Sequence, residues 1–219
     1  MTRHRPAFTR TLIAIILVVF VLEGLAGIPL WGVGNEHTPR LAAIGAINSN
    51  VFANGEYWRL VTAIFLHIGI LHLLLNVWAL YQLGSVFEVL FGSGRFALTY
   101  FVSGIVASIA SARYIAPGTI SAGASGAIFG ILGALIIAIR RSPRWRNESW
   151  ARGLTGQLIF WAAINILVIS RFPGIDNRAH IGGFVAGLVL GLIPHRVPPP
   201  PPNEMVIDVD RTPGHFGSE

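Results

Sequence analysis

The chain has 219 residues, of which 53% are hydrophobic and 12% are charged, and its mean hydropathy is +0.63. Soluble domains carry roughly 25% charged residues, so this composition excludes an ordinary soluble domain and indicates a helical membrane protein. All 16 basic residues are Arg and there is no Cys, which excludes a thiol nucleophile, a cysteine metal site and a serine–lysine dyad. The net charge of +6 is typical of Arg residues beside membrane spans, so we expect contact with the lipid bilayer and no nucleic-acid partner.

Six apolar stretches follow one another, and each predicts a membrane span. A polar, basic segment of residues 1–10 precedes them, and a long loop of residues 32–57 follows the first. This loop is long for a connection without structure of its own, so we expect a folded or interfacial element there. The predicted spans are residues 11–31, a second span within residues 58–91 whose apolar part is 60–81, and residues 96–112, 122–139, 154–170 and 179–194.

These stretches predict an all-α polytopic membrane protein with a six-helix membrane domain at residues 11–196. Five consecutive prolines at positions 198–202 open the last segment, residues 197–219, which we predict to be a disordered tail.

The distribution of Arg predicts the orientation of the spans. The basic N-terminal segment and the basic loop of residues 140–152 are both expected on the cytoplasmic side. Counting six spans from a cytoplasmic N-terminus places that loop inside, in agreement, and places the C-terminal tail inside as well. The absence of Lys and of a seventh span fits a bacterial plasma membrane protein.

Two side chains suited to nucleophilic chemistry are predicted at the same depth. Ser125 lies near the start of the fourth span and His180 near the start of the sixth, and both spans begin at the outer face. At 1.5 Å per residue, both residues are expected roughly 5–10 Å below the outer boundary. They are candidates for a nucleophile and its general base.

Glycines on the same two spans predict a close approach of the helices. Gly183 and Gly187 share a helix face with His180, and Gly126 begins a matching stripe of small residues beside Ser125. The alternative is that these glycines only pack helices together and that His180 caps a helix end.

The second span carries further polar groups. His72 and Asn76 are four residues apart and face the same way, so they are candidate hydrogen-bond donors to an oxyanion. A metal site built from His67, His72, Asn76 and His180 is an alternative. No firm ligand pattern such as H-E-x-x-H supports it, so we predict no metal and no cofactor. Asp176 could orient His180, but we expect it in a loop near water and favour a dyad.

Four short motifs carry a family resemblance. They are Trp58-Arg59 at the entry to the second span, HLLLN at 72–76, GASG at 123–126 and DNRAHIGG at 176–183. In this order, on these spans, they make the chain similar to the rhomboid family of intramembrane serine proteases over about residues 31–194.

The resemblance implies that Ser125 attacks a peptide carbonyl and that His180 moves the proton. It implies an oxyanion site formed by the Ser125 backbone N–H, Asn76 and His72, with no cofactor. Structural roles are implied for six residues: Trp58, Arg59, Gly123, Gly126, Gly183 and Gly187. The implied substrates are single-span membrane proteins cut near the outer end of a helix.

Two other classes of function are weighed against the protease. One is a catalytically silent chaperone or binding protein on the same scaffold, and the other is a small transporter with a proton path through His and Asn. The presence of both Ser125 and His180 argues against the first, and the scarcity of acidic residues in the spans argues against the second. The sequence predicts no particular natural substrate and no oligomeric state.

Overall fold

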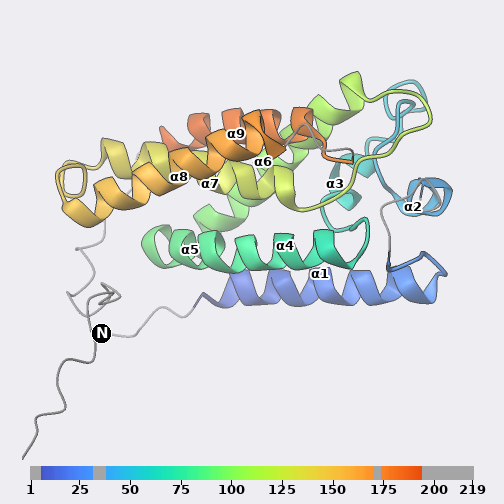
Figure 1. Cartoon of the computed structure of the whole chain (residues 1–219), viewed down its shortest axis with the longest axis horizontal. Helices are drawn as coiled ribbons and strands as arrows, with labels where there is room; N and C mark the ends of the chain where they lie inside the picture. Colours follow the sequence, from blue (N-terminus) through green and yellow to red (C-terminus); the bar gives the residue numbers. More distant parts are fainter. Residues whose placement is uncertain (1–5, 32–37, 170–173, 194–219) are drawn as a thin grey trace, which may run out of the picture.

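The computed structural model describes residues 6–31, 38–169 and 174–193. Within these ranges every regular element is a helix, apart from one isolated bridge between Ile47 and Ser121. The all-α prediction is therefore confirmed. Figure 1 shows the long helices running alongside one another, with the short helices α2 (Thr38–Ile44) and α3 (Arg59–Thr62) together at one end. The long helices are α1 (Ala7–Leu25), α4 (Ile70–Ala79) with its continuation, α6 (Ser93–Tyr114), α7 (Ser125–Arg141), α8 (Ser149–Leu167) and α9 (Asn177–Gly191).

Three helical segments are long and apolar enough to cross a membrane, as the composition predicts. They are Ala7–Leu25, Ile70–Phe91 and Ser93–Tyr114 among the residues that the structure describes. The central helix α7 has 17 residues and α9 has 15, so both are shorter than these three. Six membrane spans remain a prediction.

The long helical segment Ile70–Phe91 lies within residues 58–91, where the sequence places the second span, but it begins ten residues after the start of the apolar stretch at residue 60. Gly69 adopts a φ of 79°, a conformation that side chains disfavour, and it separates the short helix α3 from α4. Helix α4 continues without a break through a π-helical turn, η2 (Leu80–Gly84), into α5 (Ser85–Phe91). We call this continuous segment, Ile70–Phe91, the rod. Gly84 lets the rod lie close to Thr9 of α1 and Phe96 of α6.

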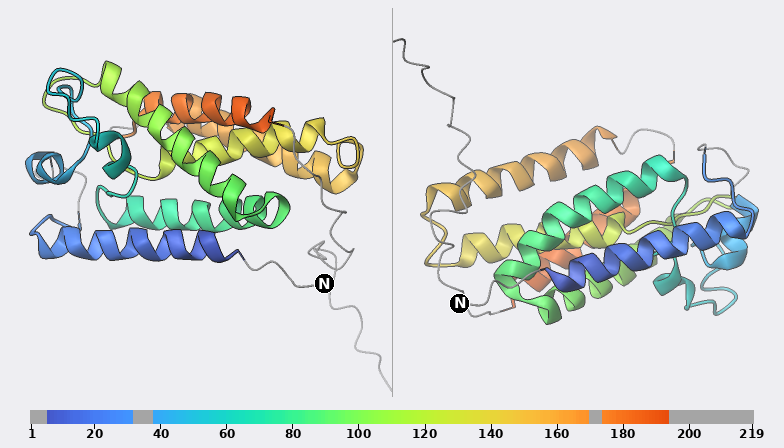
Figure 2. Two further views of the ribbon diagram at one scale, coloured as in Figure 1. Left: turned by 180° about the vertical axis from the view of Figure 1, so that it is seen from behind. Right: turned by 90° about the horizontal axis from the view of Figure 1, so that it is seen from below.

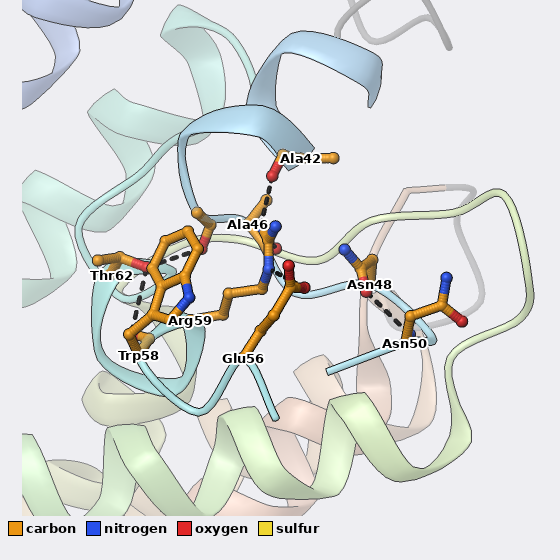
Figure 3. A network of polar contacts seen from close by, with 9 residues as sticks. Ala42, Ala46, Asn48, Asn50, Glu56, Trp58, Arg59 and Thr62 are labelled. Atoms are coloured by element: carbon orange, nitrogen blue, oxygen red, sulfur yellow. Dashed lines mark hydrogen bonds and ion pairs between the residues drawn. The ribbon is translucent and has the colours of Figure 1, made fainter. Parts of the chain in front are cut away.

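The first loop is a folded element over its described part, residues 38–57. Arg59 donates to the Glu56 carboxylate at 2.8 Å and to the Ala46 carbonyl at 3.1 Å, and it also bonds the Ala42 carbonyl. Its guanidinium carbon lies 4.5 Å from the centre of the Trp58 ring. Figure 3 shows this arginine reaching into the loop from the start of α3, so a single side chain holds the end of α2 against α3.

A buried carboxylate joins the start of α1 to the rod and to α6. Glu88 accepts hydrogen bonds from the backbone N–H groups of Phe8 and Thr9, at 2.9 and 2.8 Å, and from the Thr9 hydroxyl at 2.7 Å. It also accepts from the Ser93 hydroxyl at 2.6 Å. The first N–H groups of a helix have no partner within it, and an anion is favoured there. Glu88 therefore caps α1 from a neighbouring helix.

The core of the molecule is α7, which is buried on all sides, with α6 and α9 packed against it (Figure 1). The predicted glycine faces meet directly. A Cβ added to Gly183 would strike the carbonyl of Gly126, and one added to Gly187 would strike the carbonyl of Gly130. Backbone thus lies against backbone along this interface, as small residues permit in membrane helices.

We expect Gly187→Ala to lower the free energy of unfolding by about 3 kcal/mol, because the added methyl group must displace the α7 backbone. Thermal unfolding in detergent measures the change. Gly153→Ala on α8 is the matched control: a Cβ there meets nothing within 4 Å, so stability should be unchanged or rise by up to about 1 kcal/mol. Equal stability of Gly187→Ala and the parent would contradict the tight contact.

Candidate active site

A hydroxyl and an imidazole meet where α7 and α9 begin. Ser125 is the first residue of α7, and His180 lies in the first turn of α9. The Oγ atom of Ser125 and the Nε2 atom of His180 are 3.0 Å apart, which is hydrogen-bond distance. His180 is buried and Ser125 is half-buried. A hydroxyl bonded to an imidazole is the arrangement in which the imidazole can take the proton as the oxygen attacks an electrophile.

The His180 ring is held by stacking rather than by a carboxylate. The Phe129 ring, one turn after Ser125 on α7, lies 4.4 Å from the imidazole centre with an interplanar angle of 16°. The Nδ1 atom of His180 has no hydrogen-bond partner among the residues that the structure describes. The pair therefore has no third member in this part of the chain.

The Asp176 carboxylate caps α9 and contacts α6. It caps α9 by accepting from the backbone N–H groups of Arg178 and Ala179, at 3.1 and 3.2 Å. It also accepts from the Ser111 hydroxyl near the end of α6. Asp176 lies just before α9, in the segment where the sequence places a loop, and it is half-buried. The carboxylate fixes the start of α9, and with it the position of His180.

An extended segment leads into Ser125 and is held by backbone bonds on both sides. Ile47 and Ser121 exchange two hydrogen bonds, at 2.9 and 3.0 Å, and the Gly123 N–H donates to the Ala63 carbonyl at 2.9 Å. Gly123 has a φ of 131°, which only glycine adopts readily. The folded first loop and the end of α3 thus determine where α7 begins.

His72 lies against this segment. A Cβ on Gly123 would be 2.6 Å from the His72 Cε1 atom and 2.9 Å from its Nε2 atom, so the ring faces the segment that leads to Ser125. The Nδ1 atom of His72 accepts a long hydrogen bond, 3.4 Å, from the Ile68 N–H. We assign the proton of the neutral ring to Nε2 on that basis, which gives the ring a donor on the side of Gly123.

Two other polar side chains of this region, Asn76 and His67, each bond a backbone carbonyl. Asn76 is buried one turn after His72, and its amide donates to the His72 carbonyl at 2.8 Å, which leaves one amide hydrogen for another acceptor. The His67 ring bonds the Phe65 carbonyl through Nδ1 at 3.1 Å and lies 5.3 Å, centre to centre, from the His72 ring. In the described ranges no group of three His, Asp or Glu side chains is arranged to hold a metal ion.

Sequence reasoning missed Glu23 and Phe129 as neighbours of this region. Glu23, near the end of α1, is buried, and its carboxylate accepts from the His67 N–H at 3.1 Å. Its position as the only acidic residue in the first apolar stretch was a usable signal, because ionisable groups inside a membrane usually have a partner or a function. Phe129 gave a weaker signal, as an aromatic residue one turn from Ser125.

The close packing of α7 and α9 brings a serine hydroxyl against a histidine ring, and comparison with known proteins specifies the family. Residues 54–197 match the model of the Rhomboid domain. Rhomboid protease GluP of Bacillus subtilis is 40% identical over 183 residues, which are 84% of this chain and 34% of that protein. RHOMBOID-like protein 1 of Arabidopsis thaliana is 37% identical over 174 residues, 80% of this chain and 43% of that protein.

The chain belongs to the rhomboid family, which confirms the resemblance in the sequence. Its apolar helices and this membership make it a multi-pass membrane protein. Rhomboid-type serine protease 2 of Emericella nidulans is a further relative, 32% identical over 146 residues, 67% of this chain and 28% of that protein. The chain thus corresponds to between a quarter and a half of the length of these three relatives.

We expect Gly123→Ala to destabilise the protein by at least 1 kcal/mol more than Gly118→Ala does. Both glycines have positive φ values, so both substitutions strain the backbone by about 1–2 kcal/mol. Only at position 123 does the added Cβ also strike a neighbour, the His72 ring, whereas at position 118 nothing lies within 4 Å. Thermal unfolding of both variants measures the difference, and equal losses would show that His72 does not rest on Gly123.

Proposed function

We propose that the protein is a serine-type endopeptidase that cleaves transmembrane segments through a Ser125–His180 dyad. The observation that carries the proposal is the 3.0 Å contact between the Ser125 Oγ and the His180 Nε2 atoms, at the meeting point of two tightly packed helices. Two relatives named rhomboid protease and rhomboid-type serine protease support the same activity.

The chemistry follows from the two side chains. The Ser125 oxygen attacks the scissile carbonyl carbon as His180 takes its proton, and a tetrahedral oxyanion forms. Collapse of this intermediate breaks the C–N bond, and His180 gives its proton to the leaving amine. A water molecule then attacks the acyl ester with His180 as base, which releases the acid and restores the serine hydroxyl.

Three donors are proposed to stabilise the oxyanion. Ser125 is the first residue of α7, so its backbone N–H has no acceptor within the helix and lies at the positive end of the helix dipole. The Nε2–H of His72 faces the same segment, and the second amide hydrogen of Asn76 is the third donor. Gly123 lets the His72 ring approach the segment before Ser125, and Gly126 and Gly183 let the α7 and α9 backbones meet after it. Three further residues support the surrounding packing: Gly187, Trp58 and Arg59.

The proposed substrates are single-span membrane proteins cut near the outer end of their helix. Hydrogen bonds within a helix shield each peptide carbonyl, and in lipid those bonds have no replacement, so only a segment that unwinds easily exposes its carbonyl to Ser125. Helix-weakening Gly or Pro residues near the cut supply that property. No cofactor enters this mechanism.

We propose that residues 11–196 form a six-span membrane domain in a bacterial plasma membrane, with both termini cytoplasmic. The start of α1 and the Arg-rich turn between α7 and α8 lie at the same end of the bundle (Figure 1), which is the cytoplasmic end by the distribution of positive charge. The predicted tail of residues 197–219 lies outside the described residues. The alternative function, a catalytically silent chaperone or binding protein, does not explain why Ser125 and His180 are in hydrogen-bond contact.

Replacing either member of the pair should abolish cleavage. We expect Ser125→Ala and His180→Ala to give no detectable product from a single-span reporter with a Gly- or Pro-weakened outer end, in proteoliposomes, while their unfolding midpoints stay near that of the parent. Ser149→Ala, an exposed serine at the opposite end of the bundle, is the control and should cleave normally. A fluorophosphonate should label the parent at Ser125, and turnover by purified Ser125→Ala would overturn the mechanism.

Removing the Asn76 amide should slow cleavage without destroying the site. We expect Asn76→Ala to lower kcat by about 10²–10³-fold, the effect of one lost oxyanion donor. Asn165→Ala is a close match, because Asn165 also donates to the carbonyl four residues earlier in its helix, at 2.9 Å, but lies on α8. Similar kcat values for the two variants would remove Asn76 from the proposed oxyanion site.

A further inference from the structure

A cavity lies at the proposed cytoplasmic end of the bundle, between the end of α7 and the start of α8. Its volume is about 460 Å³, and its polar lining consists of Arg140, Arg146, Asn147, Arg152 and Thr155. It is distant from Ser125, which lies at the opposite end of α7. The proposed protease mechanism uses none of these residues, so their arrangement requires its own explanation.

The three guanidinium groups around this cavity have no carboxylate partner among the residues that the structure describes. The acidic residue of the turn, Glu148, does not line the cavity. Arg140 lies in the last turn of α7, where a cation is favoured by the helix dipole, but Arg146 and Arg152 are not on that helix end. Three converging cations with no internal anion are suited to bind an anion from outside.

The turn that carries Arg146 is anchored. Trp145 is fully buried, and its ring lies 5.9 Å from that of Phe91 and 5.8 Å from that of Trp150. The Arg146 N–H donates to the Ser142 carbonyl at 3.0 Å, so the backbone of the turn is fixed on both sides of the tryptophan. The backbone that carries Arg146 is therefore ordered before any ligand arrives, so binding has to order only the side chain.

The cavity changes from polar to apolar along α8. Arg152 lies at the polar end, and Gly156 and Ile159 continue the wall toward the middle of the helix. Ile159 is seven positions after Arg152, which is about 10 Å along the helix axis. Figure 2 shows α8 at the edge of the bundle, and Ile159 is 42% exposed, so this wall is open to lipid.

We propose that this cavity binds an anionic phospholipid, with the phosphate and headgroup among Arg140, Arg146 and Arg152 and the start of an acyl chain along Gly156 and Ile159. A free phosphate would use the arginines but not the apolar wall, so the gradient of polarity identifies a lipid. A phospholipid seated there fills the space between α7 and α8 at the level where positive charge meets the cytoplasmic leaflet.

The test uses the full chain in a neutral detergent and two short-chain lipids, dioctanoyl phosphatidylglycerol and dioctanoyl phosphatidylcholine, with binding measured by native mass spectrometry. The parent should bind phosphatidylglycerol at least tenfold more tightly than phosphatidylcholine. Arg146→Gln and Arg152→Gln should each weaken phosphatidylglycerol binding by about fivefold and leave phosphatidylcholine binding unchanged. Both side chains are exposed, so folding should be preserved, and the unfolding midpoint verifies this.

Arg113→Gln is the matched control, because it removes an exposed arginine at the other end of the bundle. It should leave phosphatidylglycerol binding unchanged, and an equal loss in Arg113→Gln and Arg146→Gln would show diffuse charge attraction and overturn the site. The absence of a preference for phosphatidylglycerol in the parent would overturn it too. Inorganic phosphate at the same concentration should not displace the lipid, and full displacement would indicate a site for a free anion.

Discussion

The close contact between the backbones of α7 and α9 is the constraint on which the candidate site depends. Gly183 and Gly187 face the carbonyls of Gly126 and Gly130, so no side chain separates the two helices. Ser125 and His180 extend this interface at its end, and their 3.0 Å contact is possible only because the helix axes are that close. A methyl group in the interface would therefore affect both stability and the geometry of the pair.

The remaining elements position this pair from outside. The Gly123 N–H bonds the carbonyl of Ala63, the bridge to Ile47 extends the chain before α7, and Asp176 ties the start of α9 to Ser111 of α6. These contacts are hydrogen bonds rather than apolar contacts. In lipid, burying an apolar side chain against another helix gives no hydrophobic stabilisation, so hydrogen bonds are the more effective way to fix the helices. The first loop is thus part of the support for the proposed site, through Arg59 and the residues it holds.

Sequence reasoning found the pairing of Ser125 with His180 because depth in a helix follows from residue count and because glycine spacing shows which faces meet. It placed the second span within residues 58–91 but did not find where its helix begins, since hydropathy cannot distinguish the apolar residues before Gly69 from those after it. It did not predict the contact of Asp176 with Ser111, because Ser111 lies on a helix 65 residues away and no local pattern indicates it. Six spans stay predicted from charge and hydropathy together.

The stacking of Phe129 on His180 bears on how a two-member site manages charge. During the proposed reaction the imidazole becomes a cation, and no described carboxylate bonds its Nδ1 atom. The negative face of an aromatic ring attracts a cation that lies over it, and the Phe129 ring lies parallel to the imidazole at 4.4 Å. One helix, α7, then carries both the nucleophile and the group that favours a positive charge on the base, so a rotation of α7 would disturb attack and proton transfer together.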